Sequence, residues 1–471
     1  MLTYQDFIEE TNDGTQKIAE FVQKAINQHI ASEDYRIAAD AENYDQQKNT
    51  TVMNYARYLY TAGGKKTIDP DASTSRLCSN FFHRLNTQRC VYSLGNGVKF
   101  TKHNRKEIGE DGRETTIDET KEKLGARFDT DLKRLAYKAL IHKVAFGFYD
   151  EGRLYGFSLL EFAPLYDENN GKLRAGIRFW QLDKDKPMTA VLYTEANITI
   201  LRKEKGKNLE IVGTKAYKTK TYKTDEGGIE DIVEESYSSF PIVPLYGNST
   251  QQSTLVGMKG KIDAYDLVSS GFADDIQECA QIYWLISGAA GMDDADIRDF
   301  RRRLKFNKVA APGDEQTVTP YTQEIPSQAR KVFLDDIRAS IYEDFGALDV
   351  HTVAAGATND HIDAAYQPMD EEADDFEFQI IEFLQALLEL QGIDDTPVFK
   401  RNRISNQAEQ TQMVLSAADY LDDETILSKL PFISVDEISS ILAKKDAESE
   451  ARFEDAGDEP AGGNPEDDLE E

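Results

Sequence analysis

The longest helical pattern in the sequence sets the strongest limit on its fold. From about Thr254 to Ser287 the apolar residues recur at helical spacing. At 1.5 Å per residue such a helix spans about 50 Å, whereas helices of compact domains average about 11–12 residues. Next come a short helix, DDADIRDFRRRLKF, a hairpin that turns at 312–314, and a second helix, SQARKVFLDDIRASIYEDFG. The pattern predicts an antiparallel helix pair that carries a small α/β unit at 288–325.

The sequence before this helix changes period. Residues 1–62 are predicted to be helical, and residues 74–100 to hold a helix followed by a strand-like run, CVYSLGNGVKF. A polar loop is expected at 101–116 and a further helical stretch at 118–146. From Gly147 to about Pro244 apolar residues alternate and turn-like segments separate the runs. This alternation predicts an antiparallel and mostly sequential sheet, so the fold class is α+β.

After the helix pair we expect an Ala/Gly-rich loop and then mostly helices. The loop, ALDVHTVAAGATND, covers 347–360, and a long helix follows in which Pro368 stands either in the first turn or at a kink. TPVFKRNRISN is predicted to be one strand, and residues 406–450 to form short helices with breaks near Asp422 and Pro431. In a monomer the apolar stretch Ile380–Leu390 would expose a large apolar surface, which favours a closed oligomer.

Charge excludes tight wrapping of nucleic acid. The chain has 471 residues, with 54 Lys plus Arg against 85 Asp plus Glu, a net charge of −31. Tight DNA binding needs many lysine and arginine contacts to phosphates. Residues 446–471 hold 12 acidic residues and one arginine, and we expect 456–471 to be a disordered acidic tail.

Membrane insertion, secretion and disulfide bonding are not indicated. No apolar run reaches 18 residues, and the first residues, MLTYQDFIEETND, contain no apolar signal segment. Cys78, Cys90 and Cys279 form no CxxC pair and are expected to stay reduced.

Signatures of catalysis are also absent. The sequence contains no phosphate-binding GxxxxGK[ST], HExxH, GxSxG or GxGxxG motif. His351 and His361 have no nearby cysteine and are not expected to bind metal. The frequent carboxylate pairs are expected on solvated helix faces. We therefore predict no catalytic residue, no metal and no cofactor.

One basic cluster stands out against the acidic background, and two interpretations of it stay open. It comprises Arg298, Arg301, Arg302, Arg303, Lys305 and Lys308. These side chains could simply pair with neighbouring aspartates on an exposed helix. Alternatively, they could form an electrostatic contact for a partner protein or for passing phosphates.

Five segments in a fixed order carry a resemblance to a known family. They are YSLGNGVKF (92–100), PIVPLYGN (241–248), KGKIDAYDLVSSGFADDIQECAQIYWLISGA (259–289), VAAGATNDHIDAAY (353–366) and VFKRNRISNQAEQTQMV (398–414). No single segment is a catalytic signature, but their order is specific. The sequence resembles the portal proteins of tailed double-stranded-DNA bacteriophages, in particular a siphophage subfamily.

This resemblance implies a ring, usually of twelve subunits, at one capsid vertex of the virion. Double-stranded DNA passes through its channel, and the ring is assembled in the host bacterial cytoplasm without a membrane. The implied partners are terminase, head-completion or adaptor proteins, scaffolding protein and major capsid protein. The implied parts are a wing (1–250), a stem helix (251–286), a clip (287–325), a second stem helix (326–346), a tunnel loop (347–360), a long wing helix with a strand (361–403) and a crown (404–455).

The resemblance also assigns roles to individual residues. Val350, His351, Thr352, Val353 and Asn359 would lie in the tunnel loop beside the DNA channel, and Gly356 would act as a hinge. Relatives often have a run of glycines where this chain has Ala354-Ala355-Gly356-Ala357. In the clip, Arg298, Arg301, Arg302, Arg303 and Lys305 would dock the partner proteins. The competing interpretation of the loop is a surface connection far from any channel.

Two other functions compete with the portal interpretation. The first is another ring-forming, capsid-associated structural protein without a DNA channel. The second is a soluble enzyme, such as an acidic hydrolase, whose site has no recognisable motif. A monomer with a deep pocket and clustered acids would favour the enzyme.

Overall fold

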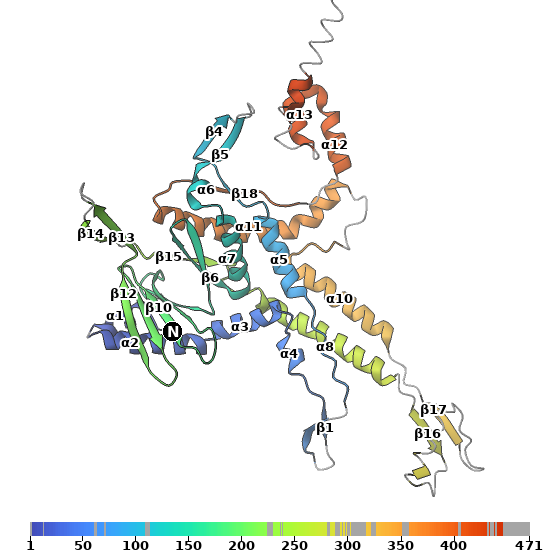
Figure 1. Ribbon diagram of the computed structural model, residues 1–471. Helices are drawn as coiled ribbons and strands as arrows, with labels where there is room; N and C mark the ends of the chain where they lie inside the picture. The colour runs from blue at the N-terminus through green and yellow to red at the C-terminus, as the bar shows by residue number, and fades with distance from the viewer. Residues whose placement is uncertain are drawn as a thin grey trace, which may run out of the picture.

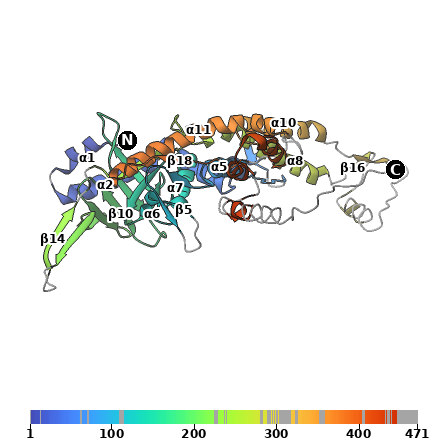
Figure 2. The ribbon, with the colours of Figure 1, turned by 90° about the horizontal axis from the view of Figure 1, so that it is seen from above.

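The structure is a computed structural model, and it combines a mixed α/β body with a two-helix arm (Figure 1). It describes residues 2–12, 14–60, 64–69, 72–108, 114–223, 229–235, 237, 239–279, 283–287, 293, 295–296, 298, 302, 317–321, 326–350, 358–403, 407–430, 433, 438 and 440–445. Seen from above, the molecule is elongated, with the N-terminal helices near one end and strand β16 toward the other (Figure 2).

Four helices begin the chain, as the sequence predicts for most of this region. They are α1 (Tyr4–Thr11), α2 (Thr15–Ala31), α3 (Glu33–Asp45) and α4 (Thr50–Met53). Thr3 starts α1 with a reciprocal capping box to Asp6, and the Ser32 hydroxyl caps α3. The end of the predicted helical region is instead extended, because β1 (Tyr58–Tyr60) pairs with β2 (Lys66–Ile68).

A five-stranded antiparallel meander forms one side of the body, in the order β12-β11-β10-β9-β8. Its strands are β8 (Phe162–Tyr166), β9 (Leu173–Trp180), β10 (Met188–Tyr193), β11 (Ile198–Lys203) and β12 (Leu209–Lys215). One face packs on α1 and α2 in a core that includes Phe7, Phe21 and Ile177.

The predicted single sheet is wrong in one respect, because the strands divide into separate units. β15 (Ile242–Tyr246), β6 (Val144–Asp150) and β7 (Arg153–Ser158) form a three-stranded sheet, with β6 in the centre. β13 (Lys218–Lys223) and β14 (Ile229–Glu235) form a separate ribbon that projects from the body (Figures 1 and 2). Bulky buried side chains separate the two sheets, and Phe146 lies against Phe162 with ring centroids 4.4 Å apart.

The three-stranded sheet packs on helices α7 (Phe128–His142) and α11 (Asn359–Leu390). Gly147 on β6 is needed for this close approach, because an added Cβ would lie 2.5 Å from the Phe383 ring of α11. Leu135 of α7 and Phe383 are both buried here. The same core corrects the expectation for Ile380–Leu390. Its apolar residues Ile380, Phe383, Leu384, Leu387 and Leu388 are buried within one chain, so they give no reason to expect an oligomer.

The segment between the first helices and α7 differs from the prediction in two places. CVYSL completes helix α5 (Phe81–Leu94), and only β3 (Val98–Phe100) is extended, where it pairs with β18 (Pro397–Phe399). The expected polar loop at 101–116 instead contains an antiparallel pair, β4 (Asn104–Ile108) and β5 (Glu114–Asp118), followed by helix α6 (Glu119–Leu124). A two-stranded ribbon needs no buried face, so its polar composition did not indicate strands.

The arm consists of α8 (Leu255–Cys279) and α10 (Ser327–Phe345), which run side by side away from the body (Figure 1). The helix predicted to reach Ser287 is shorter, because β16 (Tyr283–Ser287) pairs with β17 (Thr317–Tyr321) beyond its end. Aromatic and β-branched residues favour this strand. The hairpin turn predicted at 312–314 lies outside the described residues.

The C-terminal region contains α12 (Gln407–Ser416), a 3₁₀ turn (Ala418–Tyr420) and α13 (Asp423–Lys429). Asp422 caps α13, which agrees with the predicted break. Pro431 and the predicted acidic tail at 456–471 lie outside the described residues. Of the strand predicted at 396–406, the structure describes 396–403, and within that range Pro397–Phe399 are in a sheet.

Candidate functional site

Ion pairs near both ends hold the arm helices in an antiparallel arrangement. Near the start of α8, the Lys261 ammonium donates to Ser340 Oγ at 2.5 Å and pairs with Asp344 near the end of α10. Near the end of α8, Asp275 pairs with Arg330 at the start of α10. The pairing fixes the register between two helices that are long relative to their shared buried surface.

A ladder of hydrogen bonds ties the opposite face of α8 to an extended segment, residues 75–79. The backbone N–H groups of Ser75, Leu77 and Ser79 donate to Asp274 Oδ1, Ser270 Oγ and Asp266 Oδ1 at 2.6, 3.0 and 2.9 Å. The three acceptors are 1–5% exposed. Four helical residues rise about 6.0 Å and two extended residues about 6.6–6.8 Å, so the two spacings match. The ladder fixes this segment, which we call the stalk, along the arm.

A second polar cluster fastens the base of α8 to helices α3 and α4. The Asn49 amide donates to Asp266 Oδ2 at 2.8 Å, and the Thr51 hydroxyl donates to Asp263 Oδ2 at 2.8 Å. The Tyr44 hydroxyl also donates to Asp263. Burial raises the pKa of Asp266, although its hydrogen bonds oppose that shift. Helix α3, helix α4 and the N-cap residue of α4 therefore converge on two carboxylates of α8, Asp263 and Asp266.

The start of the predicted tunnel loop is anchored to the body. Gly346 ends α10 in the left-handed conformation, with φ of 62°, and Ala347 N–H bonds to the Tyr342 carbonyl at 3.0 Å. Asp349 pairs with Arg338 of α10 at 2.9 Å. Leu348 is buried, and its carbonyl accepts from Gln88 of α5 at 3.0 Å. Residues 347–349 are thus held in place rather than free.

The predicted channel residues divide into two groups. Val350 is 63% exposed directly after the anchored part, and Asn359 is the first residue of α11. His351, Thr352, Val353 and Gly356 lie outside the described residues. The predicted loop of 347–360 is therefore longer than the segment that joins the anchored residues to α11, because that segment runs only from Asp349 to Thr358, the N-cap residue of α11.

Two arginines after β18 clamp the middle of α11. Arg401 pairs with Asp370 at 2.9 Å and with Glu377 at 3.0 Å, and also with Asp374. Arg403 pairs with Asp363 at 3.1 Å and with Asp370, and its Nε donates to the Tyr92 hydroxyl at 2.9 Å. The carboxylates raise the pKa of Arg401. Pro368 lies inside this part of α11, which excludes the predicted first-turn position. The clamp bridges a helix segment in which proline removes one backbone hydrogen bond.

The predicted docking arginines are only partly described. Arg298 and Arg302 are helical and exposed, and Asp293 caps the turn before them by accepting from the Ala295 and Asp296 N–H groups. Arg301, Arg303 and Lys305 lie outside the described residues.

The order of these parts matches a known family of proteins. The family model described as "Phage portal protein, SPP1 Gp6-like" matches residues 24–451, which is most of the chain. The chain belongs to this family. Its function is accordingly that of a phage portal protein, and the resemblance inferred from the sequence is confirmed.

Two curated relatives agree with this assignment. The portal protein of Bacillus phage SPP1 is 22% identical over 409 residues, which cover 80% of this chain and 77% of the relative. The portal protein of Clostridium phage phiCD119 is 26% identical over 212 residues, which cover 43% of this chain and 47% of the relative. This second match thus spans about half the length of that relative. Neither the family description nor the relatives' names include a catalytic activity, and portal proteins are a structural family.

Within the described ranges, no group of three or more His, Cys, Asp and Glu side chains could hold a metal ion. No described helix is both long and apolar enough to cross a membrane. Cys78 and Cys90 are free, and burial raises the pKa of the Cys90 thiol to about 12, which keeps it protonated.

The sequence analysis missed the ladder and the arginine clamp. Asp266, Ser270 and Asp274 recur every four residues on one helix face, a spacing that could have indicated a polar stripe. Arg401 and Arg403 are two residues apart in an extended segment, so both can face the same helix. The carboxylates that pair with these two arginines recur at helical spacing. From composition alone, they could not be told apart from carboxylates on a solvent-exposed helix face.

Proposed function

We propose that twelve copies of this chain form a closed ring at one capsid vertex, through which double-stranded DNA enters and leaves. The observation that carries this proposal is the apolar surface on both outer flanks of the arm. On α10, Val332 is 48% exposed and Phe333 is 44% exposed. Near the stalk, Ile68 is 64% exposed and Leu77 is 49% exposed.

These two surfaces lie on different sides of α8. At about 100° per residue, the ladder residue Asp266 lies about 140° around α8 from Lys261 and about 180° from Asp275, the two residues that contact α10. A contact between the α10 surface of one copy and the stalk surface of the next is head-to-tail. Such a contact closes into a ring when the rotation between successive copies divides a full turn, and in this proposal that rotation is one twelfth of a turn.

The loop after α10 would then line the narrow part of the channel. In this arrangement Val350, His351, Thr352, Val353 and Asn359 lie beside DNA, and Gly356 provides backbone freedom. Twelve copies carry a charge of roughly −370, so the wall repels phosphates and DNA can slide. The anchor at Asp349 and Arg338 gives the loop a rigid base.

The end of the arm would serve the partners of the ring. We assign docking of terminase, and later of head-completion or adaptor proteins, to the clip at 287–325, with Arg298, Arg301, Arg302, Arg303 and Lys305 as contacts. Scaffolding protein and major capsid protein would hold the ring in the capsid. The site of action is the portal vertex of the virion, after assembly in the host bacterial cytoplasm.

A cysteine at Val353 tests whether the loop lines a channel. In a chain whose Cys78, Cys90 and Cys279 are replaced by serine, Val353→Cys should crosslink neighbouring copies on oxidation, and a bulky thiol reagent attached there should block DNA packaging. Val212→Cys is the matched control, because Val212 is 66% exposed on β12, and its modification should leave packaging intact. Normal packaging after modification at position 353, without interchain crosslinks, would show that the loop lies away from the DNA.

A further inference from the structure

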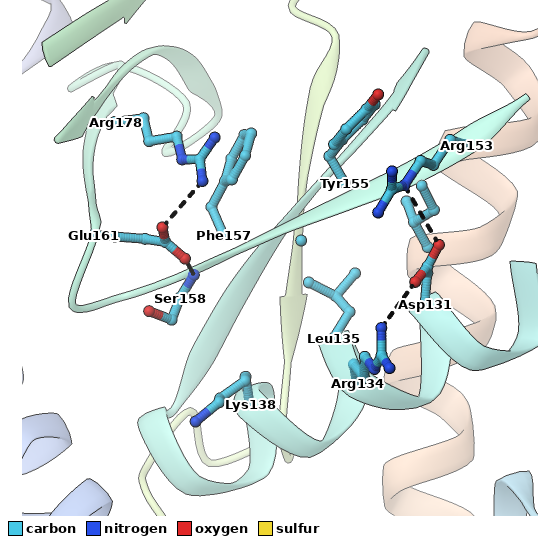
Figure 3. A pocket seen from close by; sticks show the side chains of 12 residues that line it. Asp131, Arg134, Leu135, Lys138, Arg153, Tyr155, Phe157, Ser158, Glu161 and Arg178 are labelled. Atoms are coloured by element: carbon cyan, nitrogen blue, oxygen red, sulfur yellow. Dashed lines mark hydrogen bonds and ion pairs between the residues drawn. The ribbon is translucent and has the colours of Figure 1, made fainter. Parts of the chain in front are cut away.

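Strand β7 has an open edge that borders a groove. It is the last strand of the β15-β6-β7 sheet and pairs only with β6 among the described strands. Six consecutive β7 residues, 153–158, line a cavity of about 320 Å³ (Figure 3). Because successive strand residues point to opposite faces, a cavity that touches all of them must run along the strand edge.

The two walls of the groove come from different elements. Asp131, Arg134 and Leu135 of α7 form one wall, while Glu161 and Arg178 form the other (Figure 3). Gly156 lies in the middle of β7 and is exposed. Its lack of a side chain lets Leu135 of α7 approach this part of the strand, because an added Cβ would lie 3.1 Å from Leu135 Cδ1.

The groove carries an excess of arginine. Arg134 and Arg153 share one carboxylate, Asp131, at 3.5 and 3.9 Å, and they are 68% and 49% exposed. Arg178 pairs with Glu161 at 3.3 Å. Lys138 also lines the groove, but Glu42 pairs with it at 2.7 Å. Arginine guanidinium groups held at such distances can still donate two hydrogen bonds to a further carboxylate.

Two buried polar atoms in the walls have no hydrogen-bond partner in the part of the chain that the structure describes. They are Asp131 Oδ2, which faces Arg153 Nε at an ion-pair distance of 3.9 Å but accepts no hydrogen bond from it, and Arg178 Nε. The Asp131 side chain is 8% exposed and lies between the two exposed arginines (Figure 3). Buried polar atoms are normally satisfied, so these two atoms point to a donor and an acceptor supplied by something that enters the groove.

We propose that the β7 edge binds an extended, acidic segment of a partner protein as an added strand. The segment would form backbone hydrogen bonds with β7, as open sheet edges do in β-augmentation. Carboxylates on one face of the segment would bind the Arg134 and Arg153 guanidinium groups. The proposal concerns a surface of the body and does not depend on ring formation.

A synthetic peptide that alternates glutamate with valine tests this proposal on the full chain. Fluorescence anisotropy should show binding of this peptide and at least tenfold weaker binding of a matching peptide with lysine in place of glutamate. A third peptide has the glutamate sequence but N-methylated backbone amides. It should also bind at least tenfold more weakly, because it cannot donate backbone hydrogen bonds.

Variants locate the binding surface. The double variant Arg134→Gln, Arg153→Gln should weaken binding of the glutamate peptide about tenfold, equivalent to about 1.4 kcal/mol. Lys205→Gln, Lys207→Gln is the control of equal charge change, since both lysines are exposed on the β11–β12 turn, and it should bind normally. Hydrogen exchange gives a second readout, because the peptide should slow exchange of β7 amides in the wild-type chain.

Three outcomes would overturn the proposal. If the N-methylated peptide binds as tightly as the unmethylated glutamate peptide, the interaction depends on charge and not on backbone hydrogen bonds. Equal loss in both double variants would show that the groove is not the site. Unchanged exchange of the β7 amides at saturating peptide would exclude strand addition even if binding occurs.

Discussion

The backbone N–H of Ser79 donates to the Asp266 carboxylate at 2.9 Å, although the two residues are 187 positions apart in the chain. The same carboxylate accepts from the Asn49 amide through its second oxygen. Asp266 is 1% exposed and Asn49 is 2% exposed, so the Asn49 amide would be buried without this acceptor, and the half-buried Ser79 N–H would also lose it. This bond joins the stalk to α8. The exposed apolar surface near the stalk therefore keeps its position on the arm only while this bond is present.

Removing this carboxylate should loosen the stalk. Asp266→Ala leaves the Ser79 N–H and the Asn49 amide without acceptors, at a cost of about 1–3 kcal/mol each. We expect the free energy of unfolding to fall by about 2–4 kcal/mol in urea titrations. Asp335→Ala, which changes an exposed residue of α10, is the control and should change stability by less than about 0.5 kcal/mol. Equal stability of the two variants would contradict the ladder.

Acid should destabilise the chain through Glu42. His142 donates to Glu42 at 2.9 Å, and this bond together with Lys138 lowers the pKa of Glu42 from 4.5 to about 2. A carboxylate with a lowered pKa stabilises the fold fully above its unfolded pKa and loses that effect as the pH falls. The contribution should therefore disappear between about pH 4.5 and 2.

The Glu42→Gln variant isolates this contribution. We expect it to be about 1–3 kcal/mol less stable than the wild type at pH 7, with the difference shrinking as the pH falls from 4.5 toward 2. Urea titrations at a series of pH values measure it. Burial also lowers the pKa of His142, so the wild-type chain should lose further stability below pH 6.5, as the unfolded chain takes up a proton there. A stability difference that is independent of pH would refute the assignment to Glu42.

The arginine clamp should hold the segment after β18 against α11. Arg401→Ala removes a cation from Asp370, Asp374 and Glu377 and should cost about 2–4 kcal/mol, since Glu377 is largely buried and loses its cation, although Arg403 still pairs with Asp370. Limited proteolysis should then cut near residue 400 faster than in the wild type. Arg36→Ala, at an arginine with a 77% exposed side chain, is the control. Unchanged proteolysis in Arg401→Ala would mean that β18 alone fixes this segment.

The clip arginines should act on partners rather than on assembly. Replacing Arg298, Arg301, Arg302 and Arg303 with glutamine should leave the oligomeric state unchanged and weaken binding of terminase or adaptor protein. Native mass spectrometry and a pull-down with the purified partner measure the two effects separately. Loss of the oligomer itself would show that these arginines join neighbouring copies.

Elements with a strong local pattern could be predicted from the sequence. The helix that returns along the arm, α10, lies where its apolar spacing places it, and Gly346 ends it. The alternation between 147 and 244 predicted strands, and strands occupy that region. Local pattern cannot show where a sheet divides, because Phe146 and Phe162 meet only through tertiary packing.

The parts that sequence could not supply depend on distant partners. The composition of Tyr283–Ser287 fits either the end of a buried helix or a strand. The segment is a strand because it pairs with Thr317–Tyr321. Whether Ile380–Leu390 faces solvent or the core depends on α7 and β6, which lie more than 200 residues earlier. The ladder is equally non-local, since its donors are backbone groups of a segment with no sequence signature.

Native mass spectrometry of the purified full chain measures directly whether it assembles into a ring. At micromolar concentration and moderate salt, the account predicts a dominant species of twelve copies. Val332→Glu combined with Phe333→Glu should shift this species toward monomer, because the two glutamates place charge on the α10 flank. A wild-type chain that is mainly monomeric or dimeric under these conditions would contradict the ring.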